Sequence, residues 1–139
     1  MEWEEYFSDY INCYTNGINL LPECKEDLDR ILRGSGYEQA FIRLFRMRIR
    51  FLAERGKSCH LKSDWFEILI NTNELYSMKF IGIKSKRNIR ILFIFRRNGK
   101  NLNAILVHAF EEKENKKKSK TSYNKATNIA NKRILLYNL

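Results

Sequence analysis

The chain has 139 residues, of which 44% are hydrophobic and 13% aromatic, and it carries a formal net charge of +10. This composition excludes a chain that is disordered throughout, and the length favours a single domain over residues 1–139, since domains typically contain about 100–150 residues. The excess of Lys and Arg predicts a polyanionic partner, although a basic surface can also serve solubility alone.

The first half of the chain predicts two helices. Aromatic residues between Met1 and Pro22 recur at helical spacing, but residues 10–15 also fit a short strand, so both alternatives stay open. Pro22 begins a predicted helix over 22–33, whose first turns are acidic, as the helix dipole favours. Apolar residues at helical spacing predict a longer helix over 37–55. The Gly-Ser-Gly linker between the two helices favours a helical hairpin.

The second half predicts an antiparallel sheet followed by a helix. Residues 66–70 fit a short strand or a connecting turn, and three apolar runs predict strands over 75–83, 89–96 and 102–110. The Asn98-Gly99 pair is a strong hairpin signal. We expect a lysine-rich loop at 111–121 and a helix over 123–137. Helices followed by a run of strands indicate an α+β fold with a three- or four-stranded meander.

Positive charge is concentrated along the predicted strands. From Lys79 to Lys100 the sequence contains no Asp or Glu, while Lys and Arg recur throughout. A small sheet with unopposed positive charge is suited to a polyanion, and RNA is the candidate that this pattern favours. We expect Arg96, Arg97 and Lys100, near the Asn98-Gly99 turn, to be solvated charges.

The sequence favours a cytoplasmic protein without a metal site. Acidic residues interrupt any apolar stretch near the start, so we expect no signal peptide, and no apolar run approaches the about 20 residues that span a bilayer. The three cysteines lack CxxC spacing, which is typical of reduced thiols. A metal site needs about four well-placed ligands, whereas Cys59 and His60 stand alone and the sequence has only one other histidine, His108. We therefore expect neither a metal nor another cofactor.

Four segments carry a resemblance to a known family. ELYSMK at 74–79 is similar to a family strand L-Y-E-L-R, NIRILFIF at 88–95 to a strand Y-R-I-L-Y-F, and LVHAFEEK at 106–113 to an ending L-L-H-G-F-x-K-K. The fourth segment, Ala126 to Arg133, is similar to the A-x-x-R helix that closes the family's chains. Together they resemble the RelE/ParE toxin superfamily, and most closely the phage-derived, HigB-like branch of type II toxin–antitoxin toxins. The resemblance implies a RelE-like fold, in which an N-terminal helical hairpin packs on a small antiparallel sheet with a C-terminal helix.

The chain departs from the family pattern at several positions. Ser77 and Lys79 stand where the family has glutamate and arginine, and Glu112 replaces the first of two lysines after the third strand. The loop before the last helix is longer and richer in lysine. Residues 1–7 look like an N-terminal extension.

The resemblance implies an endoribonuclease that cleaves mRNA, usually on the ribosome, and so inhibits translation. In this chemistry the ribose 2′-hydroxyl attacks the adjacent phosphate, which requires a base, fixed cations and an acid but no metal. Arg90 would stabilise the phosphate, Lys113 would assist or protonate the leaving oxygen, and Tyr123 would stack on a base or transfer a proton. The RNA backbone would be held by Lys79, Lys84, Lys86, Arg87, Lys116 and Lys117.

Each of these assignments has a plainer alternative. Arg90 fits a strand arginine turned to solvent, Lys113 a solvated lysine, and Tyr123 a packing residue. His108 matches a family histidine, but we expect a core residue with a satisfied hydrogen bond.

The family also implies a partner and two other functions. The expected partner is an antitoxin encoded beside the toxin, usually a helix-turn-helix protein, together with mRNA and the ribosome; no membrane partner is expected. The alternatives are a ParE-like inhibitor of DNA gyrase and an inactive, phage-derived nucleic-acid-binding protein.

Overall fold

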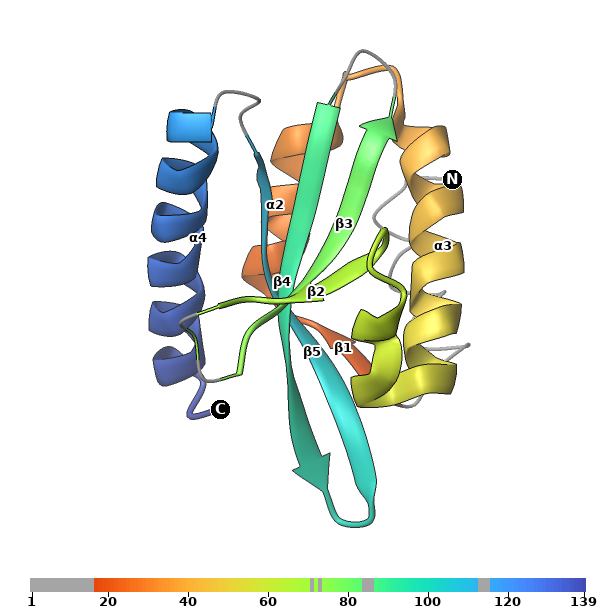
Figure 1. Cartoon of the computed structure of the whole chain (residues 1–139), viewed down its shortest axis with the longest axis vertical. Helices are drawn as coiled ribbons and strands as arrows, with labels where there is room; N and C mark the ends of the chain where they lie inside the picture. The colour runs from red at the N-terminus through yellow and green to blue at the C-terminus, as the bar shows by residue number, and fades with distance from the viewer. Residues whose placement is uncertain (1–16, 71, 73, 84–86, 113–115) are drawn as a thin grey trace.

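The computed structural model describes residues 17–70, 72, 74–83, 87–112 and 116–139. Over these ranges the chain has an α+β fold, in which helices lie on both sides of a five-stranded mixed sheet (Figure 1). The helices are α2 (Pro22–Leu32), α3 (Glu38–Arg55) and α4 (Lys116–Leu136), with a short 3-10 helix, η1 (Gly56–Leu61), after α3. The strands are β1 (Ile18–Leu20), β2 (Phe66–Ile68), β3 (Tyr76–Ile83), β4 (Arg87–Asn98) and β5 (Asn101–Glu111).

The sheet differs from the expected three- or four-stranded meander. Its order is β1-β5-β4-β3-β2, and β1 pairs parallel to β5 while the other neighbours are antiparallel. The two outer strands have three residues each, which is too short for an apolar period to be recognised in the sequence. The open alternative at residues 66–70 resolves as a strand, because Phe66–Ile68 pairs with β3.

The two predicted helices of the first half form close to their expected bounds. Pro22 occupies the first turn of α2, and Gly56 caps α3 with a positive φ of 57°, a conformation that glycine adopts at little cost. α2 packs against β5, whereas α3 packs against β3 and η1. Each of the two helices therefore packs against the sheet, α2 on β5 and α3 on β3. The expected packing of one helix against the other is a minor part of their contacts.

The last helix is longer than predicted. α4 begins at Lys116, so the second half of the loop expected at 111–121 is helical. Lysine has a good intrinsic helix propensity, and the segment contains neither Gly nor Pro. The lysine run from Lys116 onward, which the charge pattern had predicted to be a loop, is therefore part of the helix. The expected N-terminal extension and the helix-or-strand alternative at 10–15 lie outside the described residues.

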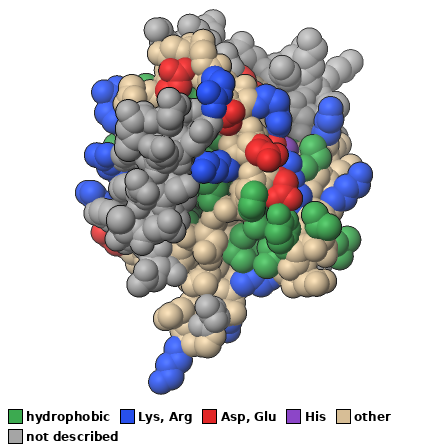
Figure 2. All heavy atoms as spheres, turned by 180° about the vertical axis from the view of Figure 1, so that it is seen from behind, with side chains coloured by type: hydrophobic (Ala, Val, Ile, Leu, Met, Phe, Trp, Pro, Cys, Tyr) green, Lys and Arg blue, Asp and Glu red, His purple; other side chains and the backbone are tan. Residues whose placement is uncertain are grey.

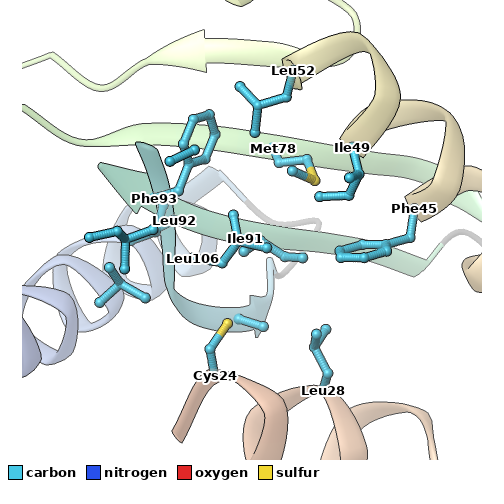
Figure 3. Close-up of a cluster of buried hydrophobic side chains, with 14 of the residues drawn as sticks. Cys24, Leu28, Phe45, Ile49, Leu52, Met78, Ile91, Leu92, Phe93 and Leu106 are labelled. Atoms are coloured by element: carbon cyan, nitrogen blue, oxygen red, sulfur yellow. The ribbon is translucent and has the colours of Figure 1, made fainter. Parts of the chain in front are cut away.

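The main core lies between the sheet and the pair α2 and α3. Figure 3 shows side chains of both helices pointing toward the strands: Cys24 and Leu28 from α2, and Phe45, Ile49 and Leu52 from α3. On the sheet, Met78, Ile91 and Ala109 are cross-strand neighbours and are buried on this side. Because successive residues of a strand alternate in direction, the residues next to them must point to the opposite side, toward α4.

Candidate functional site

Two cross-strand rows of residues form the side of the sheet that α4 covers. The first row is Lys79 on β3, Arg90 on β4 and Phe110 on β5; the second row, one step along, is Glu67, Ser77, Leu92 and His108. Tyr123 of α4 contacts this side, because its ring lies 6.0 Å from the Arg90 guanidinium and 5.3 Å from the Phe110 ring. We call Lys79, Arg90, Glu112, Tyr123 and Glu67 the Arg90 cluster.

Arg90 is a buried residue in a central strand, with only 8% of its surface exposed. Its Nε and Nη2 donate to one carboxylate oxygen of Glu112, at 2.9 and 2.5 Å. Its third nitrogen, Nη1, is buried and has no hydrogen-bond partner among the described residues. The interpretation of Arg90 as a strand arginine turned to solvent is therefore wrong. A buried guanidinium nitrogen without a partner is costly, and such a group calls for an explanation.

Tyr123 is held by its hydroxyl as well as by its ring. The hydroxyl donates to Glu67 Oε1 at 2.8 Å, and the ring meets Phe110 edge to face. Burial raises the pKa of the Tyr123 phenol; the Arg90 guanidinium opposes this, and the Glu67 carboxylate adds to it, with a net result well above the ordinary value. At neutral pH the phenol is therefore protonated and acts as a hydrogen-bond donor.

Lys79 adds a second cation directly opposite Arg90. The two residues are cross-strand partners, so their side chains leave the sheet on the same side. Like charges in this position repel each other, and Glu112 provides a counter-charge to Arg90 only. Lys79 Nζ makes no ion pair with any described residue. With Glu112 alone counted, the Lys79–Arg90 row keeps one positive charge, and Glu67 in the neighbouring row offsets that charge across the whole Arg90 cluster.

The remaining predicted site residues fall into two groups. Lys84, Lys86 and Lys113 lie outside the described residues. Arg87 begins β4, and Lys116 and Lys117 begin α4, but the structure describes only their backbone. Of the charges expected to be solvated, Arg97 and Lys100 are exposed, whereas Arg96 is half-buried and forms an ion pair with Glu74 at 2.8 Å.

Two carboxylates of the cluster were not predicted as site residues. Glu112 had a signal in the sequence, because it replaces a lysine of the family pattern at the end of the third strand. Glu67 had none: it lies 56 residues before Tyr123, and only the pairing of β2 with β3 brings it under α4. Both carboxylates are half-buried.

A second charged cluster lies at the β5 edge and differs in character. Both carboxylate oxygens of Asp27 accept hydrogen bonds, from His108 Nδ1 at 2.7 Å, Arg133 Nη1 at 2.6 Å, Arg30 Nη2 at 2.6 Å and the backbone N–H of Ala109 at 3.2 Å. Burial by itself raises the pKa of Asp27, but the bonds from His108 and Arg133 outweigh it and hold that pKa well below its usual range. We call Asp27, His108 and Arg133 the Asp27 cluster.

The Asp27 cluster joins three elements. Asp27 belongs to α2, His108 to β5 and Arg133 to α4, and Arg133 also donates to the backbone oxygen of Val107 at 3.0 Å. The prediction that His108 is a core residue with a satisfied hydrogen bond is confirmed on its Nδ1 side. The Arg133 of the sequence motif is an anchor that fixes α4 to the sheet.

Charged side chains are spread over the face of the molecule that Figure 2 shows. On the face seen in Figure 2, basic side chains are scattered among acidic and apolar ones, and the hydrophobic side chains gather in one patch. Within the described ranges, no group of three or more His, Cys, Asp or Glu side chains is arranged to hold a metal ion. In the same ranges, no helix combines the length and the apolar character that crossing a membrane requires.

Comparisons with known proteins give no match. No protein family, no curated protein and no solved structure matches this chain. The functional argument therefore rests on the chain itself.

Proposed function

We propose that this protein is the toxin of a type II toxin–antitoxin system with a RelE-like fold, and that it cleaves mRNA held on the ribosome and so inhibits translation. The observation that carries the proposal is the convergence of Lys79, Arg90 and Tyr123 on one side of the sheet. These are two neighbouring cations, of which only Arg90 has an ion-pair partner among the described residues, and an aromatic ring beside Arg90. Phosphate groups seek cations of this kind, and unpaired RNA bases stack on such rings.

In the proposed mechanism, Arg90 stabilises the negative charge that grows on the phosphate oxygens. Its Nη1 is buried without a described partner, so it becomes a donor to phosphate once a neighbouring side chain moves aside. Lys79, on the neighbouring strand, adds a second positive charge within the same row. A phosphate that reaches this pair either binds through Nη1 or displaces Glu112 from Arg90.

Proton transfer in this mechanism falls to Glu67 and Tyr123. A carboxylate can accept the proton of the 2′-hydroxyl, and Glu67 is the carboxylate that faces Tyr123. Tyr123 keeps its proton at neutral pH, so it serves as a donor to an RNA oxygen or as a stacking platform, and not as a base. Lys113, which follows β5 in the sequence, would supply a further cation.

One observation favours a second candidate function. Glu112 neutralises much of the Arg90 charge in a position where the resembling family has lysine. An arginine held in such an ion pair is a weaker electrostatic catalyst, since the pair must be broken or bypassed before phosphate binds. The protein would then be an inactive, phage-derived nucleic-acid-binding protein.

The experiment that tests the proposed function maps mRNA cleavage in a reconstituted translation reaction, with and without ribosomes. The wild-type protein is expected to cut the message only where ribosomes are present, and Arg90→Lys to cut at least about tenfold more slowly, because lysine lacks the bidentate guanidinium. Binding of RNA without any cleavage would support the second candidate instead.

The partner follows from the same proposal. A cognate antitoxin, of the helix-turn-helix kind in the resembling branch, would hold this basic protein inactive, and a net charge of +10 favours an acidic binding surface on that partner. Co-expression with the product of the adjacent gene is expected to restore growth. Continued arrest in the presence of a folded, bound product would contradict this part of the proposal.

A further inference from the structure

A groove lies beside α4, on a different flank of the helix from Tyr123. It has a volume of about 470 Å³ and lies between α2, β5 and α4. Ile31 of α2, Phe110 of β5 and Ile129 of α4 give it apolar walls. A volume of this order lies within the range of about 300–1,000 Å³ that is typical of small-ligand sites.

His108 lines the groove with an orientation that Asp27 fixes. The Asp27 carboxylate is ionised and accepts only, so the imidazole must donate its Nδ1–H across the 2.7 Å contact. The other ring nitrogen, Nε2, has no hydrogen-bond partner among the described residues. The groove therefore contains a ring nitrogen of fixed position that can form a hydrogen bond with a ligand.

The rim of the groove is cationic. Arg30 uses Nη2 to bind Asp27, but its side chain is 69% exposed, and its other nitrogens are free of described partners. Lys125 is exposed and forms no ion pair with a described residue. Glu111 also lines the groove and opposes an anion at its own side, so the favourable position for a phosphate is between Arg30 and Lys125.

An aromatic row connects this groove to the Arg90 cluster. The His108 and Phe110 rings are nearly parallel, with centroids 5.8 Å apart, and Phe110 meets the Tyr123 ring at 5.3 Å. Aromatic rings that follow one another along a basic surface are the usual platform for successive bases of a single strand. Phe110, which lines the groove, thus contacts Tyr123, whose ring lies beside Arg90.

We propose that this groove binds one nucleotide of single-stranded RNA, with the base against Phe110 and its polar edge hydrogen-bonded to His108 Nε2, and with the phosphate between Arg30 and Lys125. The proposal rests on the proposed function in taking RNA as the ligand, and it adds a subsite next to the Arg90 cluster. Its test needs no cleavage activity.

The most direct test follows the imidazole nitrogens of the full chain by NMR during titration with adenosine 5′-monophosphate. The chain has only two histidines, and His60, which contacts the Lys57 carbonyl outside the groove, is the internal control. We expect the Nε2 signal of His108 to shift and the signals of His60 to stay. Ribose 5-phosphate, which lacks the base, should shift His108 much less. Equal responses to both compounds, or no response of His108 at saturation, would overturn the proposal.

A pair of variants on α4 tests the phosphate contact. Lys125→Ala is expected to weaken binding of adenosine 5′-monophosphate about twofold to fivefold, as for one exposed ion pair. For a 2′-O-methyl oligonucleotide, it should lower the slope of log affinity against log salt by about 1. Lys132→Ala removes an exposed lysine of the same helix that does not line the groove, and it should change neither quantity. Equal effects of the two variants would contradict a specific site.

Two further outcomes separate this proposal from the proposed function. If nucleotides bind at His108 but the protein never cleaves mRNA, the groove is supported as a nucleotide site and the proposed nuclease function is contradicted. Cleavage that depends on Arg90, combined with a His108 that responds to an acidic peptide but not to nucleotides, would keep the nuclease and overturn the groove as an RNA site.

Discussion

The Asp27 cluster and the Arg90 cluster are two buried groups of charges on the same small sheet, and they differ in how completely their hydrogen bonds are satisfied. In the first, both oxygens of Asp27 are bonded, and the charges link α2, β5 and α4. In the second, Arg90 Nη1 has no described partner, and Lys79 beside it has no described counter-charge. The first arrangement stabilises a fold, and the second is suited to receiving an anion.

This difference separates two kinds of buried charge that a sequence cannot distinguish. Arg133 and Arg90 are both arginines in apolar surroundings, and each pairs with a carboxylate. Arg133 donates hydrogen bonds to Asp27 and to the Val107 carbonyl and so links α4 to α2 and β5. Arg90, in contrast, has one guanidinium nitrogen, Nη1, that its ion pair with Glu112 does not use. Substitutions in the Asp27 cluster should therefore act on stability, and those in the Arg90 cluster should act first on function.

The largest effect is expected from Asp27→Asn. It removes the charge that His108, Arg30 and Arg133 share, and breaking a buried ion pair by removing one partner costs about 3–5 kcal/mol. Urea denaturation measures the loss in the free energy of unfolding. Asp29→Asn, on the same helix, breaks the more exposed pair with Arg33 and should cost about 1 kcal/mol or less. Similar losses of unfolding free energy in both variants would show that the Asp27 cluster stabilises the fold no more than an exposed ion pair does.

Arg90→Lys should have the next largest effect, on activity. It keeps the positive charge next to Glu112 but loses the planar guanidinium and its free donor. The cleavage rate on ribosomes should fall about tenfold to a hundredfold, while the urea midpoint changes little. An unchanged cleavage rate with a large loss of stability would mean that Arg90, like Arg133, serves to stabilise the fold.

Acid should weaken the fold through Asp27. Its pKa is lower in the folded chain than in the unfolded chain, so its contribution to stability is fully present above the unfolded value of about 3.9. That contribution is lost as the pH falls below this value toward the folded pKa. The free energy of unfolding, measured between pH 6 and pH 2, should decline less steeply for Asp27→Asn than for the wild type. Parallel curves for the two proteins would contradict the assignment.

The smallest effect is expected from Tyr123→Phe. The change removes one hydrogen bond to Glu67, which costs about 1 kcal/mol of stability, and it keeps the ring beside Phe110 and Arg90. If the ring is a stacking platform, cleavage should persist in Tyr123→Phe and be lost in Tyr123→Ala. Loss of cleavage in both variants, measured on the same message, would assign the hydroxyl a role in proton transfer.

The sequence predicted most elements of the fold, because long apolar periods dictate them. The helices that begin at Pro22 and near Tyr37 and the three long strands lie within a few residues of their predicted bounds. Strand β2 was predicted only as one of two alternatives, and β1 was not predicted, because three residues carry no period. The parallel pairing of Ile18 with Ala104 depends on contacts far apart in the chain.

For the candidate site, the sequence identified the cations better than their surroundings. Arg90 and Tyr123 were singled out, and the fold brings them together. Glu112 and Glu67 were not, because a carboxylate becomes a counter-charge only through strand register and through the position of α4. That Arg90 is buried could not be known either, since it depends on the depth of β4 within the sheet.

The most direct test of the central claim is the cleavage rate of Arg90→Met combined with Glu112→Met, in a reaction that contains translating ribosomes. The double variant removes both members of the ion pair, so no unpaired charge stays buried and its stability should remain within about 1–2 kcal/mol of the wild type. If the Arg90 cluster is the active site, the folded double variant should leave the message intact. Cleavage at the wild-type rate would contradict the account.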